Sequence, residues 1–299
     1  MTTEKIFDEA LKNILSEDEI LKDEPMKHHT TFRVGGPAEY YLRPKKEQVA
    51  EVLRLCLTYQ KEYLIIGNGS NLLVSDKGIS GVVIEIGKQM DEITVDGTTI
   101  YAQAGAMLSK TAHAALEAGL TGMEFAAGIP GCVGGAVVMN AGAYGGEMKD
   151  ILKSVTVLTA DGQEKELTPG ELDMSYRHSS ITEEHYMVLG VTIALEAGSQ
   201  EQIRAKMEEL KEKRVEKQPL EYPSAGSTFK RPEGYFAGKL IMDAGLRGFQ
   251  VGGAAVSEKH CGFVINKEKA TASDVYRLIQ EVQQEVYRQF GVKLETEVK

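Results

Sequence analysis

The chain has 299 residues, of which 42% are hydrophobic and 26% charged, and its formal net charge is −10. This composition is typical of a globular protein with a substantial core, and it excludes a disordered or fibrous chain. The acidic balance argues against a broad nucleic-acid-binding surface, but it does not exclude a phosphate-bearing ligand.

The cysteines and the N-terminal sequence both give information about the cellular compartment of the protein. Cys56, Cys132 and Cys261 are odd in number, far apart and without metal-ligand spacing, which predicts reduced structural thiols and no metal site. The opening residues, MTTEKIFDEALKN, carry charge where a signal peptide would have an apolar core. We therefore expect a cytoplasmic protein.

The N-terminal segment, residues 1–24, carries eight acidic residues and three lysines. Its apolar side chains recur at helical spacing, which predicts an amphipathic helix with an acidic outer face. They are Ile6, Phe7, Ala10, Leu11, Ile14 and Leu15.

Residues 25–90 are expected to form a small α/β unit. It begins with a loop, a Gly-Gly-Pro turn at Gly35 and a strand. A helix over KEQVAEVLRLCLTYQ and strands at YLIIG and GVVIEI follow. This β–α–β order is typical of an α/β arrangement.

The pattern changes over residues 91–197. EITVDGTTIYAQAG and SVTVLTADGQEKEL each place Asp-Gly between alternating apolar positions, which is a strong β-hairpin signal. AMLSKTAHAALEAG between them predicts a helix ending at Gly119, and MVLGVTIALE predicts a further strand. We expect an α+β region rich in antiparallel strands.

Residues 198–299 are expected to form a last domain. The charged segment SQEQIRAKMEELKEKRVEKQ predicts a long helix at its entrance. A second helix is predicted over TASDVYRLIQEVQQEVYRQFG, with Thr271 as N-cap and Gly291 just past its end. The terminal GVKLETEVK, in which Glu295 and Glu297 alternate with other residues, is expected to form a strand.

Two glycine clusters suggest a ligand. GNGSNL, residues 67–72, follows a predicted strand, and such a turn can direct backbone N–H groups at a phosphate or be an ordinary loop. Leu72 replaces the third glycine of a dinucleotide fingerprint, and no Walker motif occurs. GIPGCVGGAVVMNAGAYGG, residues 128–146, holds seven glycines. It is too poor in apolar surface for a membrane span, so together the clusters favour one extended phosphate-bearing ligand.

Three polar segments have no function that spacing alone reveals. They are DMSYRHSS around Arg177, EYPSAGSTFKRPEG around Ser227, and the terminal segment with Glu297. A loop serine, an arginine beside a tyrosine and a glutamate near a C-terminus are each usually exposed.

Motifs along nearly the whole chain, from about residue 28 onward, resemble one family. In order they are TTFRVGGPAEYYL, IIGNGSNLLVSDKGISGVVI, EFAAGIPGCVGGAVVMNAGAYGGEM, SYRHS, SAGSTFKRP, AGKLIMDAGLRG and LETEV. The family is UDP-N-acetylenolpyruvoylglucosamine reductase, also called UDP-N-acetylmuramate dehydrogenase, of peptidoglycan synthesis.

The resemblance implies an α+β fold: an FAD-binding fold of the vanillyl-alcohol-oxidase type with two α+β subdomains, plus an α+β substrate-binding domain. The subdomains would be 25–90 and 91–197, and the substrate domain 198–299. The two glycine clusters would line FAD. The matching positions are Gly67, Asn68, Gly69, Ser70, Asn71, Gly128, Ile129, Gly131, Gly134, Gly135, Asn140 and Ala143.

The resemblance also implies a reaction in two halves. NADPH, the co-substrate, reduces FAD, and the reduced flavin delivers hydride to the vinyl group of UDP-N-acetylglucosamine enolpyruvate. Ser227 matches the proton donor, with help from Lys230 or a bound water, Arg177 matches the residue that stabilises the enolate, and Glu297 completes the carboxylate site. Weaker substrate-binding candidates are Tyr144, Arg214, Lys217, Lys230, Arg231 and Lys239.

The residues also allow other interpretations of the function. The chain lacks the tyrosine-bearing loop of some relatives, so it resembles a compact subclass. A different flavin oxidoreductase or oxidase on the same fold is the alternative enzyme, and a non-catalytic nucleotide-sugar-binding module is the alternative without catalysis. We expect packing or hydrogen-bonding roles for His178 and His260, and no nucleic acid, membrane or obligate protein partner.

Overall fold

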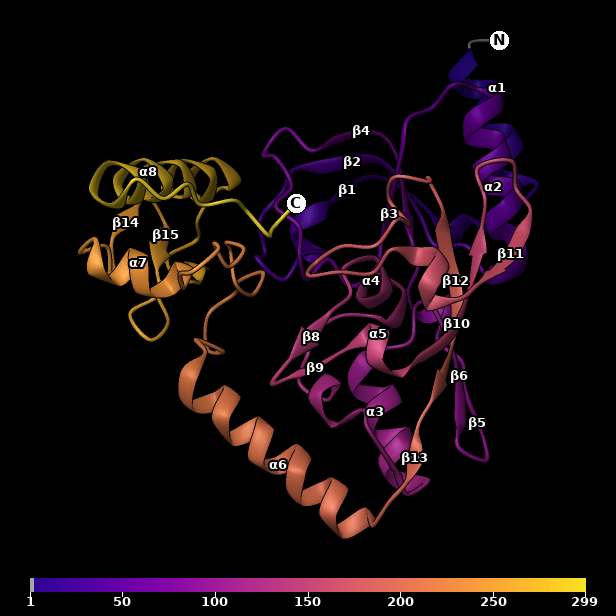
Figure 1. Ribbon diagram of the computed structural model, residues 1–299. Helices are drawn as coiled ribbons and strands as arrows, with labels where there is room; N and C mark the ends of the chain where they lie inside the picture. Colours follow the sequence, from indigo (N-terminus) through magenta and orange to yellow (C-terminus); the bar gives the residue numbers. More distant parts are fainter. Residues whose placement is uncertain (1–2) are drawn as a thin grey trace. The chain divides into compact units, whose positions relative to one another are not determined.

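The computed structural model describes residues 3–299, which fold into two compact units (Figure 1). The first unit holds the described residues up to Lys22, with Tyr40–Asn68 and Ser80–Lys213. The second unit holds Asp23–Glu39, Gly69–Ile79 and Arg214–Lys299. Two N-terminal segments thus belong with the C-terminal third of the chain. The expected assignment of four consecutive segments to separate functions stays a prediction.

Helices and strands are mixed throughout the chain, as an α+β fold requires. The helices are α1 (Thr3–Lys12), α2 (Lys46–Thr58), α3 (Leu108–Glu117), α4 (Val133–Val138), α5 (Met148–Ile151), α6 (Gln200–Lys217), α7 (Ala237–Asp243) and α8 (Ala272–Phe290). None of the helices within residues 3–299 combines the length and the apolar character needed to cross a bilayer.

A four-stranded sheet has the order β1-β2-β4-β3. Its strands are β1 (Ile20–Pro25), β2 (Pro37–Leu42), β3 (Tyr63–Ile66) and β4 (Ile79–Glu85). β3 and β4 run parallel, with Ile65 opposite Ile84. A parallel pair cannot be joined by a tight hairpin, so a long connection must follow β3. That connection contains the glycine cluster at residues 67–72.

The first unit is built around a five-stranded antiparallel sheet of order β11-β10-β12-β6-β5. The strands are β5 (Ile93–Asp96), β6 (Thr99–Gln103), β10 (Leu152–Leu158), β11 (Glu164–Leu167) and β12 (Met187–Ala194). Both predicted Asp-Gly hairpins are confirmed. Their glycines, Gly97 and Gly162, have φ of 56° and 81°, a backbone region that glycine adopts without strain.

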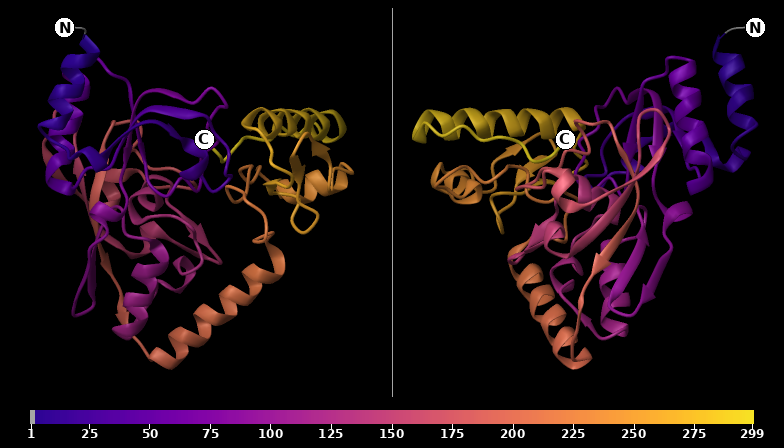
Figure 2. Two further views of the ribbon diagram at one scale, coloured as in Figure 1. Left: turned by 180° about the vertical axis from the view of Figure 1, so that it is seen from behind. Right: turned by 45° about the vertical axis from the view of Figure 1, so that its right-hand side comes forward.

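The second unit contains the three-stranded sheet β14-β15-β16. Its strands are β14 (Gln250–Val251), β15 (Ala254–Val256) and β16 (Val264–Asn266). α8 packs on this sheet and α7 packs on α8 (Figure 2, yellow and orange). Val275, Leu278, Val282 and Val286 recur at helical spacing along α8 and are buried.

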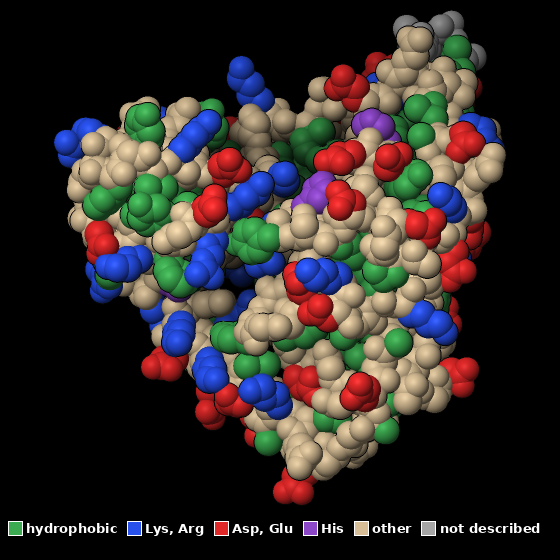
Figure 3. Space-filling view, in the orientation of Figure 1, with side chains coloured by type: hydrophobic (Ala, Val, Ile, Leu, Met, Phe, Trp, Pro, Cys, Tyr) green, Lys and Arg blue, Asp and Glu red, His purple; other side chains and the backbone are tan. Residues whose placement is uncertain are grey.

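The predicted ends of α8 are confirmed. The hydroxyl of Thr271 accepts a hydrogen bond from the amide of Asp274, which is the N-cap arrangement. Gly291 ends the helix with a left-handed φ of 67°. The predicted helix over 199–218 is α6, whose lysines and arginines appear in blue in Figure 3.

The terminal strand prediction was wrong. Residues 292–299 form no strand, only an isolated bridge between Phe229 and Thr296. Two backbone bonds flank the bridge: Lys230 N–H to Glu295 O and Glu297 N–H to Thr228 O, both at 2.8 Å. The bridge does not extend toward Thr228, because the N–H of Thr228 donates to Gly262 O and the carbonyl of Glu297 accepts from the side chain of Asn71.

Candidate active site

The glycine-rich stretch 128–146 lies along the segment that follows β6. Val133 N–H donates to Ala106 O and Gly134 N–H to Ala104 O, both at 2.8 Å. A Cβ built on Gly134 would lie 2.8 Å from the Cβ of Ala104, so this glycine allows the chain's own segments to pack closely. The stretch continues through α4 into a small hairpin of β8 (Gly142–Ala143) and β9 (Gly146–Glu147).

Within the first unit, Gly67 and Asn68 of the first glycine cluster contact the glycine-rich stretch 128–146. A Cβ on Gly67 would overlap the Sγ of Cys132, and the side-chain amide of Asn68 donates to the carbonyl of Pro130 at 2.6 Å. Cys132 is buried and free, like Cys56 and Cys261. Burial raises the pKa of Cys56 to about 11, as expected of a structural thiol.

Gly135 differs from Gly134 because it is exposed and has open space beside it. A Cβ there would meet only the Sγ of Cys132, at the ordinary contact distance of 3.7 Å. Packing within the first unit therefore does not explain why residue 135 lacks a side chain. A ligand that approaches the backbone would explain it, which is the first observation that fits a flavin at this stretch.

Thr31 supplies a second observation, within the second unit. Its amide donates to the carbonyl of Gly69 at 3.1 Å, so it adjoins the glycine cluster that follows β3. Its Oγ1 is buried and has no hydrogen-bond partner among the described residues. Because buried hydroxyls are rarely left unpaired, this oxygen fits a ligand with polar atoms, as FAD has.

Gly69 has a reason within the protein for being glycine. Its φ is 59°, and a Cβ there would overlap the carbonyl of His29. Two residues on, the side-chain amide of Asn71 donates to the carbonyl of Glu297 at 3.1 Å. These two positions are thus committed to contacts inside the second unit, and their predicted contact with the cofactor stays a prediction.

Asn140 is fully buried and joins three segments of the first unit. Its Nδ2 donates to Glu147 Oε2 at 2.8 Å and to Ser175 O at 3.0 Å, and its Oδ1 accepts from the amide of Lys149. The observed side-chain contacts are therefore structural. They also connect the β8–β9 hairpin to the loop that carries Arg177.

Arg177 occupies a tight turn. Ser175 and His178 exchange backbone hydrogen bonds, and Arg177 between them has a left-handed φ of 56°. Its Nη2 donates to Gly142 O at 3.2 Å, and its guanidinium lies 5.0 Å from the ring centre of Tyr176. The side chain is half-buried and directed by these contacts toward the β8–β9 hairpin.

Ser227 lies in the second unit, and the residue that follows it, Thr228, is held by several hydrogen bonds. Thr228 is fully buried; its amide donates to Gly262 O at 2.8 Å, and its hydroxyl accepts from the amide of Val264 at 3.0 Å. The carbonyl of Thr228 accepts from the amide of Glu297. The structure thus brings Ser227 and Glu297 into neighbouring paired segments, while Arg177 lies in the first unit.

The six substrate candidates are polar surface positions with varied partners. Tyr144 is exposed with a φ of 54°, and Lys217 is exposed near the end of α6. The others contact neighbours in the second unit: Arg214 with Gln218, Lys230 with Glu295, Arg231 with the ring of Phe236, and Lys239 with Asp243. Their substrate roles stay predictions.

The two histidines next to the motifs make protein contacts. The ring of His178 lies within 4 Å of Asp173 and Glu183, at 3.8 and 3.9 Å. His260 Nδ1 accepts from the amide of Gly262 at 3.1 Å, and burial lowers its pKa. These contacts are polar ones within the protein, and the expected packing or hydrogen-bonding roles stay predictions.

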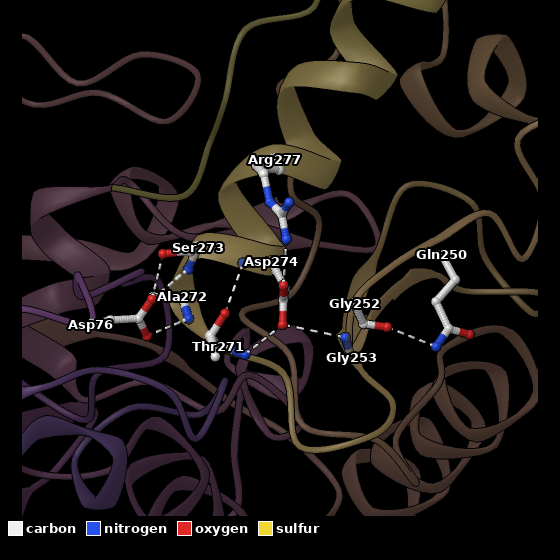
Figure 4. Close-up of polar contacts among 9 residues, drawn as sticks. All are labelled: Asp76, Gln250, Gly252, Gly253, Thr271, Ala272, Ser273, Asp274 and Arg277. Atoms are coloured by element: carbon white, nitrogen blue, oxygen red, sulfur yellow. Dashed lines mark hydrogen bonds and ion pairs between the residues drawn. The ribbon is translucent and has the colours of Figure 1, made fainter.

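Asp76 makes a contact that sequence reasoning did not predict (Figure 4). Its carboxylate accepts from the amides of Ala272 and Ser273, at 2.7 and 2.8 Å, and from the hydroxyl of Ser273 at 2.6 Å. Burial would raise the pKa of Asp76, but these three donors outweigh it and the pKa is lowered. Segment 69–79 is thereby anchored to the start of α8.

The fold and the two family matches define the class. A model described as an FAD binding domain matches residues 38–168, so the chain is a flavoprotein with an α+β FAD-binding fold. A model described as the C-terminal domain of UDP-N-acetylenolpyruvoylglucosamine reductase matches residues 218–299. Among residues 3–299, no group of three or more His, Cys, Asp or Glu side chains could hold a metal ion.

Curated relatives and a solved structure agree with these two family matches. The UDP-N-acetylenolpyruvoylglucosamine reductase of Agathobacter rectalis is 60% identical over 292 residues, covering 94% of this chain and 93% of that protein. That of Geobacillus thermodenitrificans is 52% identical, covering 97% and 96%. The crystal structure of the enzyme from Thermus caldophilus is 37% identical with a TM-score of 0.80, covering 92% and 96%. The chain belongs to the UDP-N-acetylenolpyruvoylglucosamine reductase family, and the predicted family and fold are confirmed.

Proposed function

We propose that this chain is a cytoplasmic FAD-dependent oxidoreductase that uses NADPH to reduce UDP-N-acetylglucosamine enolpyruvate to UDP-N-acetylmuramate, a step of peptidoglycan precursor synthesis. Membership of the reductase family over more than nine-tenths of the chain carries the proposal. The FAD binding domain match supports the cofactor. When bound, FAD supplies the two-electron chemistry that connects NADPH to the enolpyruvyl group.

The residues that would hold FAD are those of the two glycine clusters. Backbone of Gly67 and Asn68 would contribute from one cluster, and the exposed backbone at Gly135 from the other. The open space at Gly135 and the unpaired hydroxyl of Thr31 support this assignment. The remaining members of the proposed set would contribute through their backbone: Gly69, Ser70, Asn71, Gly128, Ile129, Gly131, Gly134, Asn140 and Ala143.

Three side chains would act on the substrate. The hydroxyl of Ser227 would donate a proton to the enolpyruvyl carbon next to the one that receives hydride. Hydride addition would leave negative charge on that carbon before the proton arrives, and this charge would spread to the substrate carboxylate, where the guanidinium of Arg177 would stabilise it. Glu297 would complete the carboxylate site. The pairing of the Ser227 and Glu297 segments supports placing these two groups in one site.

Anaerobic half-reactions test this function. The purified protein should be yellow, NADPH should bleach the flavin, and the enolpyruvyl substrate should restore its colour. Ser227→Ala should keep the reduction by NADPH and slow reoxidation by about 10²-fold or more, in the range for loss of a general acid. Ser80→Ala removes a hydroxyl from an exposed position on β4 and should change neither half-reaction.

Two outcomes would contradict the proposal. If the reduced protein is reoxidised by oxygen but not by the enolpyruvyl substrate, the chain is a different flavoenzyme. If Ser227→Ala leaves both half-reactions unchanged while the wild-type protein is active, the proton comes from another group.

A further inference from the structure

The last five residues, 295–299, which we call the tail, lie between two other segments of the second unit. On one side the tail bonds to residues 228–230 through the two backbone bonds that flank the Phe229–Thr296 bridge. On the other side it bonds to residues 71–73: Lys299 N–H donates to Asn71 O at 3.0 Å, and Leu73 N–H donates to Lys299 O at 2.8 Å. The tail therefore has backbone partners on both edges.

Glu297 is held at both of its backbone polar groups. Its N–H donates to Thr228 O at 2.8 Å, and its C=O accepts from Nδ2 of Asn71 at 3.1 Å. Leu294 and Val298 are buried in the core of the second unit. Glu297 is half-buried, and the chain bends at this residue. The main chain of Glu297 is thus held by a hydrogen bond at each of its two polar groups.

We infer that Asn71 is a positioning residue for Glu297, so its side chain serves the half-reaction with the enolpyruvyl substrate rather than the binding of FAD. The inference rests on the proposed function, since it takes Glu297 to face the substrate carboxylate. The Asn71 side chain closes the second of the two bonds that orient Glu297. Without that bond the main chain of Glu297 is held less firmly, and the tail can shift.

Asn68 offers a direct contrast within the same loop. Its side-chain amide also donates to a backbone carbonyl, but the acceptor is Pro130 in the glycine-rich stretch of the first unit. Two asparagines three residues apart thus hold two different segments. Asn68 adjoins the stretch proposed to line FAD, and Asn71 adjoins the tail that carries Glu297.

The experiment compares Asn71→Ala and Asn71→Asp with Asn68→Ala. The aspartate keeps the size of Asn71 but presents oxygen instead of N–H to the Glu297 carbonyl. Flavin content, the rate of reduction by NADPH and the rate of reoxidation by the enolpyruvyl substrate are measured for each. Both Asn71 variants should keep flavin and reduction but reoxidise about 10- to 100-fold more slowly, as misplacement of a reacting group by about 1 Å does. Asn68→Ala should instead lose flavin.

Asn266→Ala is the matched structural control. Asn266 also donates its side-chain amide to a carbonyl in the second unit, that of Phe32, at 3.0 Å. Its Oδ1 also accepts from the amide of Ala270 at 2.8 Å, so its loss should lower thermal stability at least as much as the loss of Asn71 does, without changing the ratio of the two half-reaction rates. If the Asn71 substitutions acted only by destabilising the protein, the rates of flavin reduction and reoxidation would fall by the same factor in Asn71→Ala, Asn71→Asp and Asn266→Ala.

A double-mutant cycle shows whether Asn71 acts through Glu297. In a Glu297→Gln background, Asn71→Ala should slow reoxidation further by less than about twofold, since coupled residues are not additive. Full additivity, or loss of flavin in the Asn71 variants, would overturn the inference. If Asn71→Ala does not fold, the Asn71→Asp variant tests the inference instead. Hydrogen exchange at the backbone amides of Glu297 and Lys299 must then be faster in Asn71→Asp than in the wild-type protein.

The proposed function fails separately. If wild-type protein reduces no enolpyruvyl substrate, that proposal is wrong whatever Asn71 does. If wild-type protein is active but the Asn71 variants reoxidise at the wild-type rate, only the positioning role is wrong.

Discussion

The backbone amide of Glu297 donates to the carbonyl of Thr228 at 2.8 Å, which joins the end of the chain to the segment that carries Ser227. The two residues are far apart in the sequence. Thr228 directly follows Ser227, so the hydrogen bonds of Thr228 also hold the backbone at Ser227. Thr228 is fully buried and is bonded at its amide, carbonyl and hydroxyl.

Thr228→Val should therefore destabilise the protein. Valine keeps the shape of threonine but removes the oxygen that accepts from the Val264 amide, so a buried N–H is left unpaired. We expect a loss of about 1–3 kcal/mol in the free energy of unfolding, measured by denaturant titration. Thr228→Ser keeps the acceptor and should lose less than the valine variant. Equal losses in both variants would mean that the hydroxyl is not what matters.

Thr31→Val should have the opposite effect on the protein without flavin. The Oγ1 of Thr31 is buried and unpaired among the described residues, so its replacement by a methyl group removes a desolvated polar atom. We expect unchanged or increased stability of the apoprotein, by up to about 1 kcal/mol, and weaker binding of FAD by about 5- to 10-fold. Fluorescence titration of apoprotein with FAD measures the affinity. Unchanged affinity would show that this hydroxyl does not face the cofactor.

Substitutions at the neighbouring glycines of α4 should separate cofactor binding from folding. Gly135→Leu places a side chain in open space, so the apoprotein should keep its melting temperature while the ratio of flavin to protein absorbance falls. Gly134→Leu meets Ala104 and should destabilise the apoprotein by about 1–3 kcal/mol, as overpacking does. If Gly135→Leu purifies with a full complement of flavin, the exposed backbone there does not line the cofactor.

Sequence reasoning located most local elements because their signals are local. Asp-Gly turns predicted the hairpins closed by Gly97 and Gly162, and Thr271 and Gly291 marked the ends of α8. The terminal strand was mispredicted because its alternating pattern says nothing about its partner, in which the N–H of Thr228 donates to Gly262 O instead of to Glu297 O.

The contacts that fix the site could not be predicted in the same way. Asn71, Thr228 and Asp76 owe their importance to partners far away in the sequence, and no spacing rule joins them. The glycine clusters indicated close approach but not its cause. Gly69 and Gly134 approach the protein itself, whereas Gly135 leaves open space, and only coordinates separate these cases. The proposed roles of Arg177, Ser227 and Glu297 came from resemblance alone.

The contact between Gly67 and Cys132 predicts a compensating pair of substitutions. Gly67→Ala should destabilise the protein by about 1–3 kcal/mol, because its Cβ overlaps the Sγ of Cys132. Removing that sulfur in Cys132→Ala leaves the next nearest atom, the Cβ of Cys132, at 3.7 Å. The double variant should therefore be more stable than the sum of the single effects predicts, by about 0.5–3 kcal/mol. Additive losses in urea titrations would contradict this packing.

Asp274 predicts how stability depends on pH in acid. Its carboxylate accepts from the amides of Thr271 and Gly253 and pairs with Arg277 (Figure 4). The hydrogen bond from the Thr271 amide is the main cause that lowers the pKa of Asp274 from 3.8 to about 2. A carboxyl group with a lowered pKa contributes its full stabilisation above its unfolded pKa, and loses it as the pH falls through the folded value.

Asp274→Asn should accordingly destabilise the protein by about 1 kcal/mol at pH 7, a modest amount because solvent and salt screen the charge. The difference from wild type should narrow as the pH falls from 3.8 toward 2. Denaturant titrations across this range measure it, with Glu281→Gln as a control that neutralises an exposed carboxylate on the same helix. A difference that stayed constant down to pH 2 would show that the stabilising group at the start of α8 is not this charge.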